Sequence, residues 1–469
     1  MAQQMVRYNL FPGTNFSCYE MSVAGDYSVT QSRIGGTSPL VSDSGEILVK
    51  LDWSELSTDA FNSTTDVADS AVPNLLSSTF IPELGGRPLA QFPIHLIGHS
   101  RGGSVVAEMA RLLGAEGVWV DHLTTLDPHP VSFPYGDAEV DIFVNVLFAD
   151  NYWQTNPDAF CPNGEAIFGT YDRYLANLQN GYSCDHSDVH LWYHGTIDWQ
   201  DTPASDTQAE ITSTERQTWW TPYEAQGKLA GFHYSLIGNG NRLSPDEPAG
   251  AGNGRIKDGI NQVWDFGGGN SANRFALPSN NGSWPNIIKF NLLGSQTVTQ
   301  SDLVPMQYYF QFGQSPSQSA TVRIYLDTDA NPYNGNSGQI FQITESGTGT
   351  GMVVSRPLSF NTSGTLPGTY WLYAEISDGT HTRLLHAAER LSVKPASCAY
   401  LPCLKAERVG NNLILSWTTN FTGFALESTG LLPAADWQPV GLMPAIMGNR
   451  NTVTNDLSGE QKWFRLRKP

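Results

Sequence analysis

The sequence has little that suits a membrane or a nucleic acid. No apolar run reaches the roughly 18–20 residues that a membrane-spanning helix needs. Lys and Arg number 26 against 45 Asp and Glu, which gives a formal net charge of −19. Because phosphate contacts require clustered basic side chains, this balance argues against a nucleic-acid partner. It fits a soluble protein that is exposed at a surface or exported.

Cysteine is scarce, and no C-x₂-C metal pattern occurs among the five cysteines. Cys161 and Cys184 bracket a loop, Cys398 and Cys403 are close neighbours, and Cys18 is alone. Two local pairs favour an oxidising, extracellular location, and five unpaired thiols are the alternative. The first ten residues have neither the basic nor the apolar region of a signal peptide. A secreted protein would therefore begin here after removal of its signal.

The first part of the chain alternates predicted strands and helices. Apolar runs predict strands, and apolar residues at helical spacing predict helices. The strands are expected at residues 45–53, 92–99, 118–127 and 141–150, and the helices at 65–80, up to the proline at 73, and at 104–117. This alternation predicts a mostly parallel sheet with crossover helices on its faces.

The composition changes at residues 270–286, which are rich in Asn, Ser, Gly and Pro and predict a linker. Short alternating segments follow at regular spacing and favour an immunoglobulin-like β-sandwich over residues 281–397. A break at 394–403 sets off a small β domain at 398–469. The predicted fold class is therefore α/β, with a catalytic domain at 1–280 followed by two all-β domains.

The stretch IHLIGHSRGG contains the pattern G-x-S-x-G over residues 98–102, with Ser100 at its centre. In this pattern a strand turns sharply into a helix and exposes the serine hydroxyl above the sheet. The N–H of Arg101, at the start of the helix, is placed to donate to a tetrahedral oxyanion. An apolar strand before the pattern and an amphipathic helix after it supply this context. An ordinary strand-to-helix turn is the alternative.

A serine hydroxyl needs a general base, and the base needs an acid that orients it. Asp127 and Asp150 each end a predicted strand and are the two candidates for the acid. His186, His190 and His194 have i, i+4 spacing and would share one face of a helix. His186 is the one expected on the loop ahead of that helix, where a mobile base usually lies, and His190 is the alternative. A metal site at His190 and His194 lacks an evident third ligand.

These motifs resemble the α/β-hydrolase family, and most closely its secreted lipases of the pancreatic and lipoprotein lipase type. The resemblance covers about residues 45–200, including a D-W strand end at 52–53. Those lipases have an L-D-P stretch whose aspartate is the triad acid, and a cysteine two residues before the catalytic histidine. The resemblance therefore implies Ser100 as nucleophile, Asp127 as acid and His186 as base.

Two features depart from the family pattern. Arg101 replaces a leucine, so it either holds a charged partner near the site or is solvated. The His-Gly loop that supplies a second oxyanion donor is absent, and residues 8–17 are the nearest substitute, with the donor near Gly13 or Thr14. Loss of an N-terminal strand by truncation is another explanation. An oxyanion hole with one donor fewer would lose about 10²–10³ in rate.

The resemblance implies a secreted hydrolase of carboxylic esters that works through an acyl-enzyme and needs no external cofactor. The C-terminal module resembles β-rich modules that end many secreted bacterial proteins. The two β domains would then hold the enzyme near an insoluble lipid, polyester or glycan. The alternative is a surface- or polymer-binding protein in which the hydrolase fold is inactive. The oligomeric state is not predicted.

A second motif, DTDANPYNG, begins at residue 327. Asp327, Asp329 and Asn331 place oxygen-bearing side chains at alternate positions, as loops for hard cations do. Pro332 and Gly338 stand where an EF-hand needs glycine and glutamate, so the motif is not an EF-hand. The sequence leaves two alternatives, a Ca²⁺ site on a loop of the predicted sandwich or a solvated turn.

Overall fold

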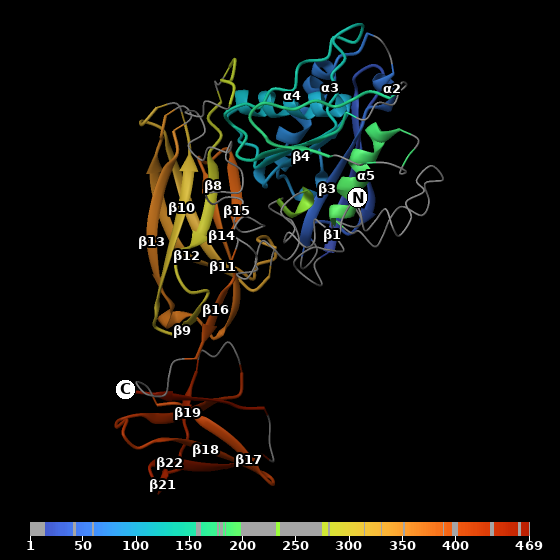
Figure 1. The fold of residues 1–469 in the computed structure, drawn as a ribbon. Helices are drawn as coiled ribbons and strands as arrows, with labels where there is room; N and C mark the ends of the chain where they lie inside the picture. Colours follow the sequence, from blue (N-terminus) through green and yellow to red (C-terminus); the bar gives the residue numbers. More distant parts are fainter. Residues whose placement is uncertain are drawn as a thin grey trace. The chain divides into compact units, whose positions relative to one another are not determined.

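The structure is a computed structural model (Figure 1). It describes residues 15–40, 44–58, 61–155, 161–175, 178, 182, 184–197, 231–234, 274–279, 282–313, 315–329, 331–349, 352–387, 389–395, 402–431, 436–457 and 461–468. The chain forms two compact units. The first comprises Met1–Gln296, Val304–Phe360 and Thr369–Leu391, and the second Thr297–Leu303, Asn361–Gly368 and Ser392–Pro469. The division into three predicted domains stays a prediction.

Two small sheets form the N-terminal part of the first unit. In one, β1 (Asn15–Val23) lies between β2 (Val29–Gly36), which is antiparallel to it, and β3 (Ser44–Asp52), which is parallel. The other sheet is wholly parallel. Its order is β4 (His95–His99), β5 (His122–Leu126), β6 (Ala149–Trp153) and β7 (Tyr171–Tyr174).

The predicted single large sheet is not formed. Among the described residues β3 pairs with β1 and β4 pairs with β5, and no ladder joins β3 to β4. A cavity of about 770 Å³ is lined by residues 47–51 of β3 and by 94–99 along β4. Side chains of a strand alternate between its faces, so consecutive lining residues mean that the strand edges face the cavity. The sheet is therefore interrupted where the prediction made it continuous.

The predicted fold class is wrong for this reason. Of the described residues, 42% are in strands and 17% in helices, and the strands form several small sheets rather than one large parallel sheet followed by β domains. The short apolar runs were identified as strands, but their partners depend on tertiary packing, which periodicity does not report.

Helices alternate with the strands along this part of the chain, and Figure 1 labels them. They are α2 (Ser54–Ser57), α3 (Thr64–Leu76), α4 (Arg101–Ala115) and α5 (Asp185–Ile197), with short 3₁₀ turns at η1 (Pro82–Leu84), η2 (Leu89–Gln91) and η3 (Gly231–Tyr234). A capping box of Ser63 and Asp66 starts α3, which continues past Pro73 to Leu76. Val67 and Ala71 of α3 and Val105 of α4 are buried in a common core. None of the described helices is long and apolar enough to cross a membrane.

The strand predicted at 141–150 begins later, because β6 starts only at Ala149. Asp150 is therefore the second residue of its strand and not the last. Asp127, in contrast, directly follows the end of β5, as the sequence indicated. The two candidate acids therefore lie at different heights in the parallel sheet. Asp127 follows the end of β5, whereas Asp150 lies near the start of β6.

The strands after the predicted linker show alternating burial. Here β10 (Leu303–Gln311) pairs with β8 (Asn286–Leu292) and β13 (Val354–Asn361). In a second sheet β11 (Ser319–Asp327) lies between β12 (Gly338–Ser346) and β14 (Gly368–Ser377), and β15 (Thr382–His386) also pairs with β14. The period of two in β10 and β11 buries one face of each strand.

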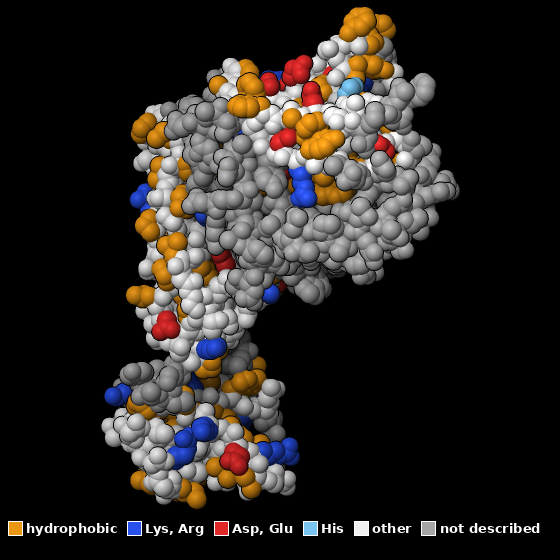
Figure 2. Space-filling model, in the orientation of Figure 1, with side chains coloured by type: hydrophobic (Ala, Val, Ile, Leu, Met, Phe, Trp, Pro, Cys, Tyr) orange, Lys and Arg blue, Asp and Glu red, His pale blue; other side chains and the backbone are white. Residues whose placement is uncertain are grey.

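The second unit consists of short strands. A parallel pair joins β9 (Thr297–Thr299) to β16 (Leu391–Lys394), and η6 (Thr362–Gly364) is a 3₁₀ turn. One sheet has the order β17 (Lys405–Val409), β18 (Asn412–Thr418), β22 (Arg450–Asp456), β21 (Ala445–Met447). Another has β20 (Gln438–Pro439), β19 (Ala425–Thr429), β23 (Trp463–Arg467). Trp417 and Leu415 are buried in the core that these two sheets share. Lys and Arg side chains are scattered among neutral ones on the face shown in Figure 2.

Candidate active site

Ser100 occupies the sharp turn between β4 and α4. It is the single residue between the two elements, and its backbone has φ 58° and ψ −129°. A non-glycine residue in this conformation is strained, and such strain is concentrated at functional sites. A Cβ at Gly98 would lie 2.1 Å from the carbonyl oxygen of Gly102, so only glycine fits there. The turn therefore depends on Gly98 and presents a half-buried serine.

Main-chain hydrogen bonds fix this turn beside the end of β5. The Ser100 N–H donates to the carbonyl of Leu126 at 3.0 Å, and the His129 N–H donates to the Ser100 carbonyl at 3.2 Å. Asp127 lies between these two partners and also has a positive φ, 44°. The serine and the aspartate therefore occupy neighbouring strand ends.

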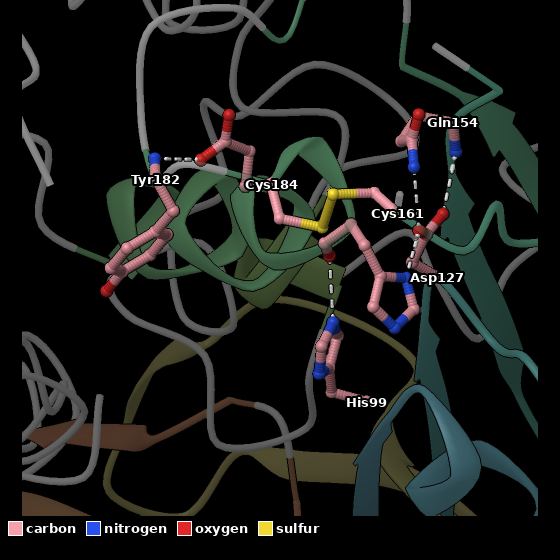
Figure 3. Close-up of a disulfide and its surroundings, with 8 residues drawn as sticks. His99, Asp127, Gln154, Cys161, Tyr182 and Cys184 are labelled. Atoms are coloured by element: carbon pink, nitrogen blue, oxygen red, sulfur yellow. Dashed lines mark hydrogen bonds and ion pairs between the residues drawn. A yellow bond between two sulfur atoms is a disulfide. The ribbon is translucent and has the colours of Figure 1, made fainter. Parts of the chain in front are cut away.

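The Asp127 carboxylate is fully buried and accepts three hydrogen bonds (Figure 3). Oδ1 accepts the main-chain N–H of Gln154 at 2.8 Å. Oδ2 accepts Nε2 of Gln154 at 2.9 Å and Nδ1 of His186 at 2.6 Å. The sequence analysis did not identify Gln154. Its position directly after β6, beside the strand end that carries Asp127, was the available signal.

His186 is the second residue of α5 and is 6% exposed. It therefore lies in the first turn of the helix and not on the loop ahead of it. Because Nδ1 faces a carboxylate, the proton is assigned to Nδ1 and the lone pair to Nε2. In the described part of the chain Nε2 is buried and has no hydrogen-bond partner. The imidazole thus has the tautomer of a general base whose basic nitrogen is not occupied.

A disulfide fixes the start of α5. Cys161 and Cys184 are bonded, with their Cα atoms 5.8 Å apart, and Cys184 directly precedes the helix (Figure 3). The predicted pairing of these two cysteines is confirmed. Cys18 is buried and has a free thiol. The bond ties the segment that carries His186 to the loop that follows β6.

His99, the residue before Ser100, contacts His186 from the opposite side. Its Nε2 lies 2.8 Å from the His186 carbonyl oxygen, and the two rings are 4.6 Å apart. Burial, together with the nearby His186, lowers the pKa of His99 to about 4. His99 is therefore neutral at physiological pH. It holds the backbone of His186 without adding a charge beside its ring.

His190, the alternative base, does not contact Asp127. Its ring stacks on Tyr182 at 5.2 Å and lies 5.1 Å from the ring of His99. The partners of the Asp127 carboxylate are Gln154 and His186. No cluster of His, Cys, Asp or Glu able to hold a metal occurs in the described part of the chain.

Asp150, the alternative acid, belongs to a different buried group. Its Oδ1 accepts from Thr124 at 2.6 Å and lies 2.8 Å from Nε2 of His122, and its Oδ2 accepts the Tyr152 hydroxyl at 2.8 Å. Burial raises the pKa of Asp150 to about 7. Asp150 has no contact with His186, so Asp127 is the acid candidate that a candidate base touches.

The Arg101 side chain has a charged partner. Its guanidinium forms two hydrogen bonds with the buried Asp137 carboxylate, at 2.6 and 2.7 Å, and donates to the carbonyls of Ser57 and Asn62. The side chain is thus an anchor for neighbouring loops. The N–H of Arg101 is the first of α4 and has no intrahelical acceptor. Gly13 and Thr14, proposed for the second oxyanion donor, lie outside the described residues.

An apolar cavity adjoins the turn. The 770 Å³ cavity between β3 and β4 reaches Gly98, His99 and Gly102, which flank the serine. Most of its remaining lining is aliphatic or aromatic, including Val49 and Met109. Its volume lies in the range of ligand pockets in general.

Comparisons with known proteins give no family for this chain. No family model matches it, and no curated protein matches it. Among solved structures, the CARDB domain of a Pyrococcus furiosus protein in complex with di-metal ions is 14% identical, with 24% of this chain and 90% of that chain covered and a TM-score of 0.16. A superoxide reductase (neelaredoxin) from Ignicoccus hospitalis is 13% identical, covering 23% and 80%, with a TM-score of 0.15.

A β-glucosidase from Listeria innocua is 11% identical, covering 24% of this chain and 17% of that chain, with a TM-score of 0.19. These likenesses are too weak to support an argument about function. The predicted membership of the α/β-hydrolase family, and of its pancreatic and lipoprotein lipase branch, is wrong. The β3–β4 interruption breaks the large parallel sheet that the resemblance implied, and the described residues form several small sheets instead.

Proposed function

We propose that this chain hydrolyses carboxylic esters, with Ser100 as nucleophile, His186 as general base and Asp127 as the acid that orients it. The observation that carries the proposal is the 2.6 Å contact between Asp127 Oδ2 and His186 Nδ1, with Nε2 left without a partner in the described residues. The strained turn of Ser100 is held beside this pair by hydrogen bonds to Leu126 and His129. Among the described residues no hydrogen bond joins Ser100 Oγ to His186 Nε2, so the proposal requires the two groups to approach each other when substrate binds. Serine–histidine–aspartate triads occur on unrelated folds, so the proposal does not depend on family.

In the first half of the reaction, Ser100 Oγ attacks the ester carbonyl while His186 Nε2 takes the hydroxyl proton. Asp127 stabilises the imidazolium that forms, and the Arg101 N–H donates to the oxyanion. The tetrahedral intermediate collapses, the carbon–alkoxide bond breaks, and His186 gives its proton to the departing alcohol. In the second half, water attacks the acyl-enzyme by the same route and releases the acid.

The surroundings favour an ester with an apolar part. The cavity beside Gly98, His99 and Gly102 offers an apolar space next to the reacting serine. The Cys161–Cys184 disulfide is compatible with an extracellular location, as is the net charge of −19. A secreted enzyme would meet lipids or other insoluble esters. The β-rich part of the chain would then hold the enzyme at the surface of such a substrate.

The test is hydrolysis of p-nitrophenyl butyrate and p-nitrophenyl palmitate by the wild type and by Ser100→Ala. We expect Ser100→Ala to lose at least about 10⁴-fold in kcat. Ser32→Ala, an exposed serine on β2, is the matched control and should retain the wild-type rate. Equal rates for wild type and Ser100→Ala would overturn the proposal and favour a binding protein.

A further inference from the structure

The loop between β11 and β12 carries two aspartates and an asparagine at alternate positions, and it is not a solvated turn. Asp327, the last residue of β11, is 1% exposed, and Asn331 is 0% exposed. Hydrophilic turns normally leave such side chains in water, because burying a polar group costs free energy unless it is well bonded. The burial therefore requires an explanation.

Local hydrogen bonds order three oxygen-bearing side chains of the loop. Oδ1 of Asp327 accepts the N–H of Asp329 at 3.1 Å, and Oδ1 of Asp329 accepts the N–H of Asn331 at 2.8 Å. Oδ1 of Asn331 in turn accepts the N–H of Tyr333 at 3.0 Å. Each side chain is thus fixed by a main-chain N–H two residues further along the loop.

The second oxygen of Asp327 is the feature that points to a ligand. Oδ2 is buried and has no hydrogen-bond partner in the part of the chain that the structure describes. No Lys or Arg of that part forms an ion pair with Asp327 or Asp329. This buried carboxylate therefore lacks a counter-charge among the described residues.

The neighbouring side chains offer further oxygens. The Asn334 amide nitrogen lies 3.0 and 2.8 Å from the two Asp329 oxygens, and that of Asn336 lies 2.6 Å from Oδ2. Turning either amide by half a rotation exchanges its nitrogen for its oxygen, which is then a possible metal ligand. The loop therefore combines two carboxylates with amide and main-chain oxygens. Among the described residues no histidine or cysteine cluster adds nitrogen or sulfur ligands.

We propose that this loop binds one Ca²⁺ ion through Asp327, Asp329 and Asn331. Oxygen-only ligands of mixed type select a hard cation, and Ca²⁺ tolerates the irregular arrangement that a loop provides, whereas Mg²⁺ demands near-ideal octahedral geometry. The two carboxylates balance the charge of the ion. Calcium would supply the missing partner of Asp327 Oδ2 and remove the repulsion between Asp327 and Asp329.

Calcium at this position would also stabilise the packing of this loop against residues 87–91, which precede β4. Arg87 lies over the Tyr333 ring at 3.9 Å, and the Gln91 side chain hydrogen-bonds the Tyr333 hydroxyl. These residues precede β4 within the first unit, so a fixed loop would support the approach to the strand that ends at Ser100. The inference is independent of ester hydrolysis, since it concerns stability and ion binding alone.

The experiment measures thermal unfolding and isothermal titration of the full chain after EDTA treatment, with CaCl₂ and MgCl₂ as probes. We expect one Ca²⁺ per chain, with a Kd of roughly 10⁻⁴–10⁻³ M, and a Tm that rises with calcium concentration. Asp327→Asn should weaken binding at least about tenfold, because it removes one of two ligand charges. Asp378→Asn is the matched control, since Asp378 makes the same kind of turn between β14 and β15.

The design separates loss of binding from loss of folding. Asp327→Asn removes an unpaired buried charge, so its calcium-free form should be at least as stable as the calcium-free wild type. A normal Tm for this variant without calcium, combined with no rise in calcium, would support the proposal. No calcium-dependent shift of the wild type up to about 10 mM would overturn it, because that exceeds the range of extracellular calcium modules. An equal shift with Mg²⁺ would overturn the assignment to calcium.

Discussion

Two buried aspartate–histidine pairs stand at neighbouring strands of the β4–β7 sheet, and the proposed function assigns catalysis to only one of them. Asp127 meets His186 at 2.6 Å, and Asp150 meets His122 at 2.8 Å. Both carboxylates are 0% exposed. The residue types, distances and burial are therefore nearly the same, and the position along the strand differs.

Asp127 follows the end of β5, where the chain turns and Ser100 stands beside it. Asp150 is the second residue of β6, within the sheet, and its His122 partner stacks on the ring of His95 at 3.9 Å. A pair within a sheet is enclosed by neighbouring strands, whereas a pair at the strand end can face a substrate. The proposal therefore assigns chemistry by the place of each pair in the sheet and not by residue type.

The largest expected effect comes from replacing each of the two aspartates, one at a time, by asparagine. Asp127→Asn should lower kcat about 10⁴-fold, because an amide no longer holds the imidazole in the required tautomer. Asp150→Asn should leave kcat within a few-fold of the wild type. Steady-state hydrolysis of p-nitrophenyl butyrate, with folding checked by circular dichroism, measures both. A comparable loss in the two variants would remove the distinction between the pairs.

The disulfide distinguishes the pairs further, because it restrains only the segment that carries His186. Replacing Cys161 and Cys184 together by serine should cost about 3 kcal/mol of unfolding free energy for a loop with a sequence separation of 23. Guanidinium titration measures this loss. Cys18→Ala, which removes a buried free thiol, is the control. If the double variant were as stable as that control, the bond would not constrain the chain.

Gln154 supports the Asp127–His186 pair, because its main-chain and side-chain nitrogens both donate to the Asp127 carboxylate. Gln154→Leu keeps the main-chain donor and removes the side-chain donor to a charged group, which is worth roughly 1.5–3 kcal/mol. We expect kcat to fall about 10–100-fold with KM nearly unchanged. A change confined to KM would instead assign Gln154 to substrate binding.

A further difference between the pairs is the pH dependence of stability that Asp150 contributes. Its pKa rises from the ordinary 3.8 to about 7 in the folded protein, so the folded state binds the proton more tightly than the unfolded state. The contribution to stability is therefore complete below about pH 4 and is lost as the pH rises toward 7. Asp150→Asn should gain Tm relative to the wild type across this range. A difference that does not change between pH 4 and 8 would contradict the raised pKa.

The sequence permitted the local features of the site to be predicted. The glycine spacing around Ser100 indicated the turn, the end of an apolar run placed Asp127, and the loop spacing of Cys161 and Cys184 suggested their bond. These features depend on a few neighbouring residues, which periodicity and turn chemistry report. His186 was expected ahead of its helix and is instead the second residue of that helix, in its first turn.

The remaining features depend on contacts between distant segments. Gln154 reaches Asp127 from the next strand, and no pattern in its own segment marks it. Asp150 was misplaced because residues 141–148 are as apolar as a strand but are not paired as one. The interruption between β3 and β4 likewise depends on which strand edges pair, and the sequence pattern does not report pairing. The resemblance of the serine motif to a known family wrongly favoured a continuous sheet.

The most direct test of the central claim is covalent labelling of the intact protein with a fluorophosphonate, read by mass spectrometry of the peptides. The account predicts one phosphonyl group per chain on Ser100, lost in Ser100→Ala and in His186→Ala, because the reagent requires a serine activated by a base. Labelling of Asp150→Asn should equal that of the wild type. An unlabelled Ser100 in the folded wild-type protein, or equal labelling after removal of His186, would contradict the account.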